Sequence, residues 1–485
     1  MTQNADLRQR TIRSLGWQLL GAGGQRVVQF LGIAVLARLI AIEDIGLFGI
    51  VLAGVAAIEA LTFFTGEQSQ IHSARGGERP YLDTVFTVRL LRGLVVGGVL
   101  AALAPAFAWW FHKPEFDGRY WLTGLFLALS ANGLLEAFQS PARAARMKEL
   151  DFRRVAFGDF SAALLGTGVQ IGLAWWLRDV WALVLGTLAA TLLRSLCSYA
   201  VAPYTPRLRL EREALRDLTG YTFGAAGTPF LLMLIAQGPA LVLGKLFEAT
   251  VIGVYSYCER LSKIGEDVCL RVLAPVAIPA YAKLKDEPAR LAHAWLRSVR
   301  TIVLLALPGT AALVWMGNAL PAVVFGPEYG AVAWLFPLLA FRGGIAAVNS
   351  VIGPLFWAIG EPWRDRRAQL LRTVLLFGLG VPLALAYGAA GFAAAAAIAI
   401  TAALAVSMRF ALQRLQVPGA EVGRALAQAA SPGLAMVALL LLVDLVAAPE
   451  GLARVGAGCA LAAAFVALAA VRGGLVRTGA LRRSC

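Results

Sequence analysis

Charged residues at helical spacing interrupt an otherwise apolar stretch near the middle of the chain. Glu259, Lys263, Glu266 and Asp267 follow one another at steps of three or four residues, and Arg260 stands beside the first. Such steps bring side chains to one face of a helix. Because an apolar surrounding cannot solvate charge, we expect this face either to line a water-filled interior or to pair internally, as Glu259 with Lys263.

Arginines within apolar stretches indicate binding of an anion. Arg26 and Arg342 lie in long apolar runs, and Arg260 lies on the charged helix face. A guanidinium group keeps its charge when partly desolvated and offers a planar fork of N–H donors to a phosphate. We therefore predict that Arg26, Arg260 and Arg342, supported by Lys263, bind an anionic group. For Arg26 the alternative is pairing with a helix carbonyl or an acid.

Four acidic residues in the same apolar stretches have two interpretations: Glu59, Glu136, Asp159 and Glu266. They could neutralise the arginines when no anion is bound. Alternatively, one of them could bind H⁺ or Na⁺, because burial raises the pKa of a carboxyl group into a useful range.

The sequence lacks the common signatures of catalytic and metal sites. Its three histidines and five cysteines form no cluster with metal-ligand spacing. Neither a phosphate-binding loop nor a GxSxG or HExxH motif occurs. We therefore expect no metal, no cofactor and no enzymatic activity.

The elements that carry these residues are membrane-spanning helices. Hydrophobic residues make up 59% of the 485-residue chain and charged residues 15%, and the mean hydropathy is +0.70. Apolar runs long enough to cross a bilayer recur from end to end, without the alternation of a β-barrel. We predict an all-α polytopic membrane protein of about 14 transmembrane helices. Their expected ranges are 15–37, 45–66, 85–110, 119–141, 155–177, 180–202, 219–244, 250–274, 299–319, 331–358, 370–388, 390–412, 424–447 and 452–471.

The basic residues determine the expected topology. Most of the 44 Lys and Arg fall in every second connection between the predicted helices, and such residues collect in cytoplasmic loops. Both termini are therefore expected in the cytoplasm. Arg89, Arg92 and Arg143 lie near cytoplasmic helix ends, where they could capture anionic headgroups, although topology alone also accounts for them. The net charge of +15 then reflects topology and attraction to the lipid bilayer, and we expect no nucleic-acid partner.

Two parts of the chain resemble each other. VLARLIAIEDIGLFGI at 35–50 aligns with VLGKLFEATVIGVYSY at 242–257, so that Arg38 meets Lys245 and Gly46 meets Gly253. We expect each stretch to form a turn between helices, with the glycines allowing close packing. The alignment predicts two six-helix bundles related by a parallel repeat. We assign the N-terminal bundle to 1–202, a cytoplasmic linker to 203–218, the C-terminal bundle to 219–412, and helices 13 and 14 with a basic cytoplasmic tail to 413–485.

The first of these stretches also carries a family resemblance. LARLIAIEDIGLFGI resembles the Leu-Ala-Arg-Leu-Leu-x-Pro-x-Asp-Phe-Gly-Leu signature of bacterial polysaccharide flippases for O-antigen and exopolysaccharide. These belong to the multidrug/oligosaccharidyl-lipid/polysaccharide (MOP) exporter superfamily. Ile42 stands where the family usually has proline. Further similar segments, in the family's order, are LDFRRVA at 150–156, IGVYSYCERLSKI at 252–264, IPAYAKLKDEPARL at 278–291 and FGPEYGAVAWLFPLLAF at 325–341.

The resemblance implies a MOP-type transporter fold and a flippase. Its cargo would be a glycan on undecaprenyl pyrophosphate, moved from the cytoplasmic to the outer leaflet of the bacterial inner membrane by alternating access. A glycan polymerase and export machinery are the implied protein partners. Arg260 matches an arginine that faces the cavity of the related lipid II flippases. Their Arg-Asp pair in the first helix would fall near Gly32–Ile33 and is absent, which argues against lipid II as cargo. The alternative is a cation-coupled multidrug or small-molecule antiporter of the same superfamily.

Overall fold

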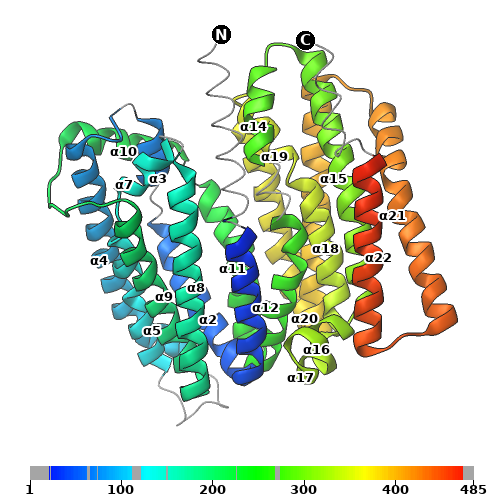
Figure 1. The fold of residues 1–485 in the computed structure, drawn as a ribbon, viewed down its shortest axis with the longest axis horizontal. Coiled ribbons are helices and arrows are strands. Elements are labelled where there is room, and N and C mark those ends of the chain that lie inside the picture. Colours follow the sequence, from blue (N-terminus) through cyan, green and yellow to red (C-terminus); the bar gives the residue numbers. More distant parts are fainter. Residues whose placement is uncertain are drawn as a thin grey trace. The chain divides into compact units, whose positions relative to one another are not determined.

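The structure is a computed structural model that describes residues 21, 23–62, 66–73, 75–111, 122–148, 151–225, 227–267 and 274–472. In these ranges the chain forms helices throughout and no strand, which confirms the predicted all-α class (Figure 1). The two chain ends, which were predicted to lie in the cytoplasm, fall outside these ranges, as do residues 268–273 of the span predicted at 250–274. The chain divides into two compact units, residues 1–253 and 254–485.

The first unit begins with a helix over 23–39. It continues through α2 (Ile42–Leu61), α3 (Gly66–His72), α4 (Arg79–Trp110), α5 (Leu122–Ser130), α6 (Asn132–Ala137), α7 (Ala142–Lys148), α8 (Phe152–Leu177), α9 (Val180–Val201), α10 (Arg212–Ala225), α11 (Thr228–Leu246) and the start of α12 (Ala249–Ser262).

The second unit contains the rest of α12 and a further series of helices. These are α14 (Ala274–Lys283), α15 (Pro288–Met316), α16 (Ala319–Phe325), α17 (Pro327–Val332), the short 3₁₀ helix η2 (Ala333–Leu335), α18 (Phe336–Asn349), α19 (Ile352–Ala358), α20 (Pro362–Leu415), α21 (Gly419–Ala447) and α22 (Gly451–Arg472).

The helices suit a protein that crosses the membrane many times. In the part that the structure describes, eight helical stretches are long and apolar enough to span a bilayer, and three apolar helices are shorter. The predicted count of 14 therefore remains a prediction. One difference has a clear cause: α20 covers two predicted spans but is not helical at Tyr387 and Gly388, where the glycine has φ +65°. This break lies where the sequence separates residues 370–388 from 390–412.

A second difference concerns the span predicted at 219–244. Residues up to Ala225 belong to α10, which begins at Arg212 within the predicted linker. The next helix, α11, begins only at Thr228, after Gly227 with φ +95°. That backbone conformation is open to glycine and costly for other residues, so it ends one helix and starts another. The span therefore begins nine residues later than predicted.

Small residues set the packing of the first unit. A Cβ atom added to Gly158 of α8 would lie 2.2 Å from Val201 of α9, and one added to Gly166 would lie 2.9 Å from the Ala190 side chain. Helices can approach this closely only where side chains are missing. As a result α8 and α9 lie side by side along much of their length (Figure 1).

The glycines of the two aligned stretches pack against each other within the first unit. A Cβ on Gly46 would lie 1.8 Å from the carbonyl oxygen of Ala249, and one on Gly253 would lie 2.4 Å from that of Ile42. Close packing at both glycines is therefore confirmed. Lys245 ends its helix as expected of a cation at the negative pole of the helix dipole, and its Nζ donates to the Trp110 carbonyl at 2.6 Å.

The predicted linker is attached to the first unit. Arg75, in the turn before α4, forms ion pairs with Glu211 at 2.8 Å and Glu213 at 2.7 Å. The Tyr204 hydroxyl donates to Asp83 at 2.6 Å, and burial together with this carboxylate raises the pKa of Tyr204 above its usual value. The boundary between the compact units lies later, at Gly253. The assignment of a six-helix bundle to each half of the chain stays a prediction.

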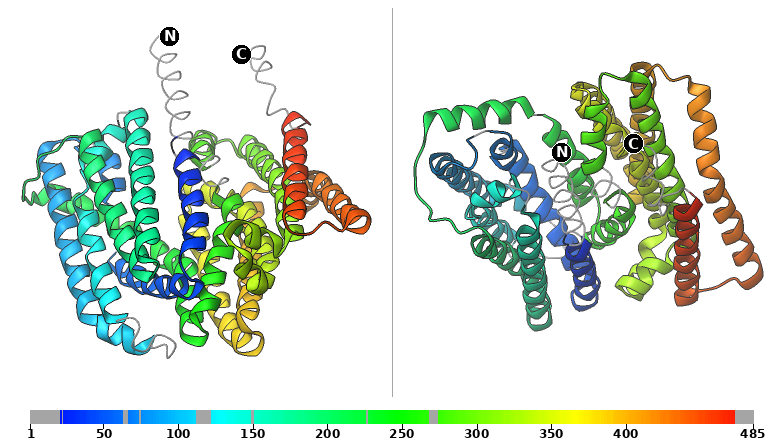
Figure 2. Two further views of the ribbon diagram at one scale, coloured as in Figure 1. Left: turned by 60° about the horizontal axis from the view of Figure 1, so that its bottom comes forward. Right: turned by 45° about the horizontal axis from the view of Figure 1, so that its top comes forward.

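The second unit packs around large buried side chains. Trp295 of α15, Tyr281 of α14 and Phe356 of α19 are almost fully buried in one apolar cluster. α21 and α22, the helices expected at the end of the chain, are joined by a short loop (Figure 2). Both pack against α15, so they belong to the body of this unit.

Candidate functional site

The second unit holds a charged cluster centred on Glu259 of α12. Lys263 Nζ lies 2.9 Å from Glu259 Oε1, and Arg342 Nη2 of α18 lies 3.5 Å from the same oxygen. The helices are close because a Cβ on Gly343 would lie 2.2 Å from the carbonyl oxygen of Ser262. The pair Glu259–Lys263 expected from the sequence therefore forms, and it also includes an arginine from a distant part of the chain.

Two arginines are buried together beside this carboxylate. Arg342 is 4% exposed and Arg372 of α20 is 8% exposed. The Nε and Nη2 atoms of Arg342 have no hydrogen-bond partner. Arg372 has no ion pair or hydrogen bond with any residue that the structure describes, and its charge acts on Arg342, Glu259 and Glu266 at longer range. Buried guanidinium groups with unused donors are suited to bind an anion.

The charges of the cluster do not balance. Lys263, Arg342 and Arg372 carry three positive charges, against two on the carboxylates of Glu259 and Glu266. Arg260 adds another cation: its side chain is exposed, with the guanidinium carbon 5.8 Å from the centre of the Tyr257 ring. Three of the four cations predicted to bind an anion thus lie on α12, directly after α12 and on α18, all in one unit.

Arg372 was not among the predicted site residues, because it lies at the predicted start of the span 370–388, next to the basic residues of the preceding connection. α20 begins at Pro362, eight residues before the predicted start of the span at 370, so Arg372 lies well inside the helix. A signal for its burial was present. Ala368, Gln369, Arg372, Thr373 and Leu376 are buried at helical spacing, which is the pattern of a core-facing stripe.

The first unit holds a second charged group, around Arg143 of α7. Its guanidinium bridges Glu67 of α3 at 2.9 Å and Asp159 of α8 at 2.7 Å. Burial alone would lower the pKa of Arg143, but the two carboxylates outweigh it and raise that pKa. Asp159 is thus neutralised by an arginine that was itself predicted to capture headgroups.

Arg92 and Arg89 of α4 differ in their contacts. Arg92 donates to the backbone carbonyls of Thr62 at 2.6 Å and Glu59 at 3.1 Å, which caps the end of α2. Arg89 is half-buried, and among the described residues its guanidinium makes no hydrogen bond or ion pair. It lies within the electrostatic influence of Glu67 and Glu136.

Glu59 lies beside a second carboxylate. Its Oε1 atom is buried without a hydrogen-bond partner, while its side chain hydrogen-bonds Asn132 and its charge interacts with Glu136 of α6. Thr191 of α9 donates to the Asn132 amide oxygen at 2.8 Å, which orients that amide. Two neighbouring carboxyl groups around one oriented amide are an arrangement in which one proton or cation can be shared.

The predicted site residues thus fall into separate groups. Arg26 is exposed on the helix over 23–39 in the first unit, whereas Arg260, Lys263 and Arg342 are in the second. A search of the described residues for three or more His, Cys, Asp or Glu able to hold a metal ion finds no such group. The assignment of roles to these residues remains a prediction.

Comparison with known proteins gives the family. A family model described as polysaccharide biosynthesis protein matches residues 35–333, more than half of the chain. The chain belongs to this family. The chain is also 24% identical to the succinoglycan biosynthesis transport protein ExoT of Rhizobium meliloti, over 78% of this chain and 74% of that protein.

Solved structures give the same fold. The lipid II flippase MurJ in an inward closed conformation matches with a TM-score of 0.70 at 11% identity, over 94% of the chain described here and 99% of the MurJ chain. An inward-facing multidrug resistance MATE family transporter of the MOP superfamily matches with a TM-score of 0.64 at 17% identity, over 81% of this chain and 94% of that one. The predicted MOP-type fold and the multi-pass membrane location are thereby confirmed.

Proposed function

We propose that this protein is a flippase that moves a lipid-linked oligosaccharide across the bacterial inner membrane. The glycan would be carried on undecaprenyl pyrophosphate and turned from the cytoplasmic to the outer leaflet by alternating access, for cell-surface polysaccharide synthesis. The family supports this proposal, as do the name of ExoT as a transport protein and the fold shared with a lipid flippase.

The observation that carries the proposal is the buried pair Arg342 and Arg372. A charge inside a membrane protein is costly unless it faces a partner or serves transport. The buried guanidinium groups of Arg342 and Arg372, together with Lys263, carry more positive charge than Glu259 and Glu266 neutralise. A pyrophosphate supplies the missing negative charge and several acceptor oxygens. Arg260 on α12 and Lys263 directly after it are the further cations that we assign to this anion; Arg26 stays a candidate from the sequence.

Arg89 is the best of the three arginines proposed to capture headgroups. Arg143 forms ion pairs with Glu67 and Asp159, and Arg92 donates hydrogen bonds to backbone carbonyls at the end of α2. Arg89 has no such partner in the described part of the chain, so its donors are available to an incoming phosphate.

Glu59 and Glu136 are the best candidates for binding the coupling ion. Their carboxyl groups interact and Glu59 keeps a buried oxygen without a donor, which H⁺ or Na⁺ would satisfy. Asp159 is paired with Arg143, and Glu266 serves to balance the charge of Arg372. We place both termini in the cytoplasm and expect glycan polymerase and export machinery as partners.

Flipping in proteoliposomes tests the proposal. The probe is a fluorescent undecaprenyl-pyrophosphate oligosaccharide, and its accessibility to a membrane-impermeant quencher reports the leaflet. We compare wild type, Arg342→Gln and the control Arg366→Gln, which removes the same charge from an exposed position on α20.

We expect rapid flipping by wild type and by the control, and a loss of at least about tenfold for Arg342→Gln, since a hydrogen bond to a charged group contributes about 1.5–3 kcal/mol. Equal flipping by all three proteins would remove Arg342 from the site. No flipping by wild type, with proton- or sodium-driven efflux of organic cations instead, would identify an antiporter.

A further inference from the structure

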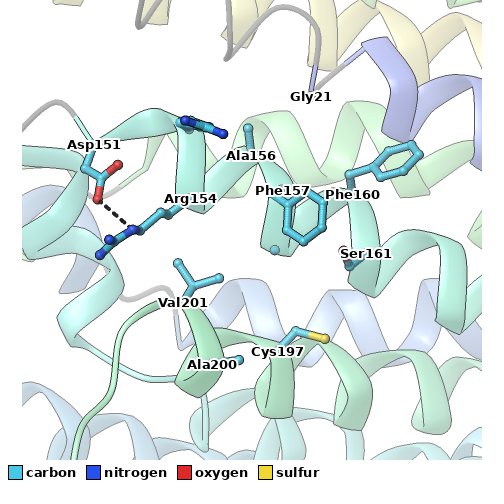
Figure 3. Close-up of a pocket in the computed structure, with 12 residues that line it drawn as sticks. Gly21, Asp151, Arg154, Ala156, Phe157, Phe160, Ser161, Cys197, Ala200 and Val201 are labelled. Atoms are coloured by element: carbon cyan, nitrogen blue, oxygen red, sulfur yellow. Dashed lines mark ion pairs between the residues drawn. The ribbon is translucent and has the colours of Figure 1, made fainter.

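A large groove on the first unit is separate from all the residues assigned to transport. It lies between the beginning of α8 and the end of α9, near Gly21, and has a volume of about 1160 Å³ (Figure 3). That exceeds the range of about 300–1,000 Å³ usual for small-molecule pockets. The inference drawn from it does not depend on the proposed transport activity.

The two ends of the groove differ in chemistry. Asp151 and Arg154 lie at one end, whereas Phe157, Phe160 and Ser161 lie at the other (Figure 3). Ala200, Val201 and Cys197 form the side contributed by α9. A ligand that fills the groove must therefore combine a polar part with an apolar part.

The polar end carries an excess of positive charge. Arg153 and Arg154 line it, and the one carboxylate of the lining, Asp151, is paired with both Arg146, at 3.3 Å from its Oδ2 atom, and Arg154. The pair Arg154–Asp151 spans 3.8 Å and the Arg154 side chain is 66% exposed. Such an exposed pair contributes about 0–1 kcal/mol, so an anion of higher charge density displaces it readily.

The start of α8 adds to this preference for an anion. Arg153 and Arg154 occupy the first turn of the helix, where the dipole is positive and cations are unfavourable. The turn contains no acidic residue, and the Asp151 side chain makes no capping hydrogen bond. The N-cap side chain therefore accepts from none of the first backbone N–H groups of the helix. An anion at this position would relieve the repulsion and accept from these amides.

An apolar path continues from the groove along α8. Phe157 is 72% exposed, and Leu164 and Leu165, two turns further along the same face, are each 51% exposed. In a membrane-spanning helix this face meets lipid chains. The polar end lies where α8 begins and α9 ends, which is the level of the headgroups on the side predicted to be cytoplasmic.

We propose that this groove binds an anionic phospholipid of the cytoplasmic leaflet, with its phosphate at Arg153 and Arg154 and an acyl chain against Phe157. Basic pockets between membrane helices on the cytoplasmic side are suited to such headgroups. Apart from these arginines and Asp151, Ser161 is the one polar residue of the lining. An oligosaccharide needs many more hydrogen-bond partners, so the lining favours a phospholipid over the proposed transported lipid.

Lipid titration of the full-length protein tests this site. Delipidated protein in detergent is titrated with phosphatidylglycerol or phosphatidylcholine, and bound lipid is counted by native mass spectrometry. The variants are Arg153→Gln/Arg154→Gln, which removes the charge, and Ala200→Trp, which fills the apolar side with all charges kept. The control is Arg366→Gln/Arg367→Gln, which removes two exposed charges from α20. Thermal unfolding without lipid identifies any variant that fails to fold.

We expect phosphatidylglycerol to bind wild type and control alike, and phosphatidylcholine to bind weakly. The arginine double variant should raise the Kd by about 30-fold, from about fivefold for each arginine near an anionic headgroup. Ala200→Trp should abolish the same binding, and it carries the test if the double variant does not fold. Equal loss in the control would reduce the effect to general surface charge and overturn the proposal. Unchanged binding by Ala200→Trp would do so as well, as would an arginine double variant that loses undecaprenyl-pyrophosphate oligosaccharide binding but keeps phosphatidylglycerol binding.

Discussion

The substitution Arg372→Met tests whether the buried arginine pair is kept for binding rather than for folding. Arg372 is 8% exposed and forms no ion pair or hydrogen bond in the described part of the chain. Methionine is shorter but has a similar volume, and it adapts its shape to the space left behind. Removing this cation leaves the buried Glu259 paired with Lys263 at 2.9 Å. Glu266, whose charge also acts on Arg372, is only half-buried and therefore reaches solvent.

The expected change in stability follows from these contacts. Replacing buried ionic groups with apolar side chains of similar volume often stabilises a protein by about 1–4 kcal/mol. The attractions of Glu259 and Glu266 for Arg372 are lost, but the repulsion from Arg342 is relieved and cancels one of them. We therefore expect a gain of about 1–2 kcal/mol, the lower part of that range. The measurement is thermal unfolding of the purified protein in detergent, with Arg366→Met as the control.

Transport should change in the opposite direction. If Arg372 donates to the anionic headgroup, its loss removes a charged hydrogen bond of about 1.5–3 kcal/mol, or about 10- to 150-fold in flipping rate. The assay is flipping of the fluorescent lipid-linked oligosaccharide in proteoliposomes. A lower Tm for Arg372→Met would show that the arginine is a structural partner and would refute the reasoning. A higher Tm with normal flipping would remove Arg372 from the binding site.

Three further predictions concern other parts of the chain. Gly46→Ala should destabilise the protein by at least about 1–3 kcal/mol, because the new Cβ would lie 1.8 Å from a backbone oxygen of α12. In the control Gly98→Ala the new Cβ meets nothing within 4 Å, so the Tm should stay unchanged or rise. Equal effects of the two substitutions on the Tm would contradict this packing. Arg143→Met should lower stability by about 1–2 kcal/mol, because two partly exposed carboxylates lose their partner; a loss of flipping at unchanged Tm would instead indicate headgroup capture. Burial opposes ionisation of Glu361, but hydrogen bonds from two arginines outweigh it and hold the pKa of this carboxyl below its usual value of 4.5. Its contribution to stability is therefore present above that pH and is lost as the pH falls through the folded-state pKa; the Tm difference between wild type and Glu361→Gln should shrink in that range, and a difference independent of pH would contradict the assignment.

Much of the fold follows from local features of the sequence. Long apolar runs fix where helices lie, because the bilayer thickness sets their length. Breaks are harder to place, since a glycine in an apolar run is compatible with a helix or a bend. Gly388 interrupts α20 where two spans were expected, whereas Gly227 separates α10 from α11 at a point that hydropathy does not mark.

The candidate site was less predictable, because tertiary contacts decide it. Helical spacing on α12 predicts the pair of Glu259 and Lys263, which are one turn apart. No local pattern joins them to Arg342, which lies on another helix. For Arg143 the tertiary contacts contradict the local pattern. Its position near a helix end suggests a cation that is available to a ligand, but Glu67 and Asp159, on two other helices, neutralise its charge.

The aligned stretches at 35–50 and 242–257 illustrate how a repeated motif can serve packing rather than chemistry. Gly46 approaches the turn that contains Gly253, and Gly253 approaches the turn that contains Gly46. Next to them Thr250 donates to Glu43 at 3.3 Å, and these two residues are also equivalent in the alignment. The Cβ distances leave no room for a side chain at either glycine, so each stretch is constrained by the other. Because this contact alone accounts for both glycines, packing is sufficient to explain why the stretch recurs.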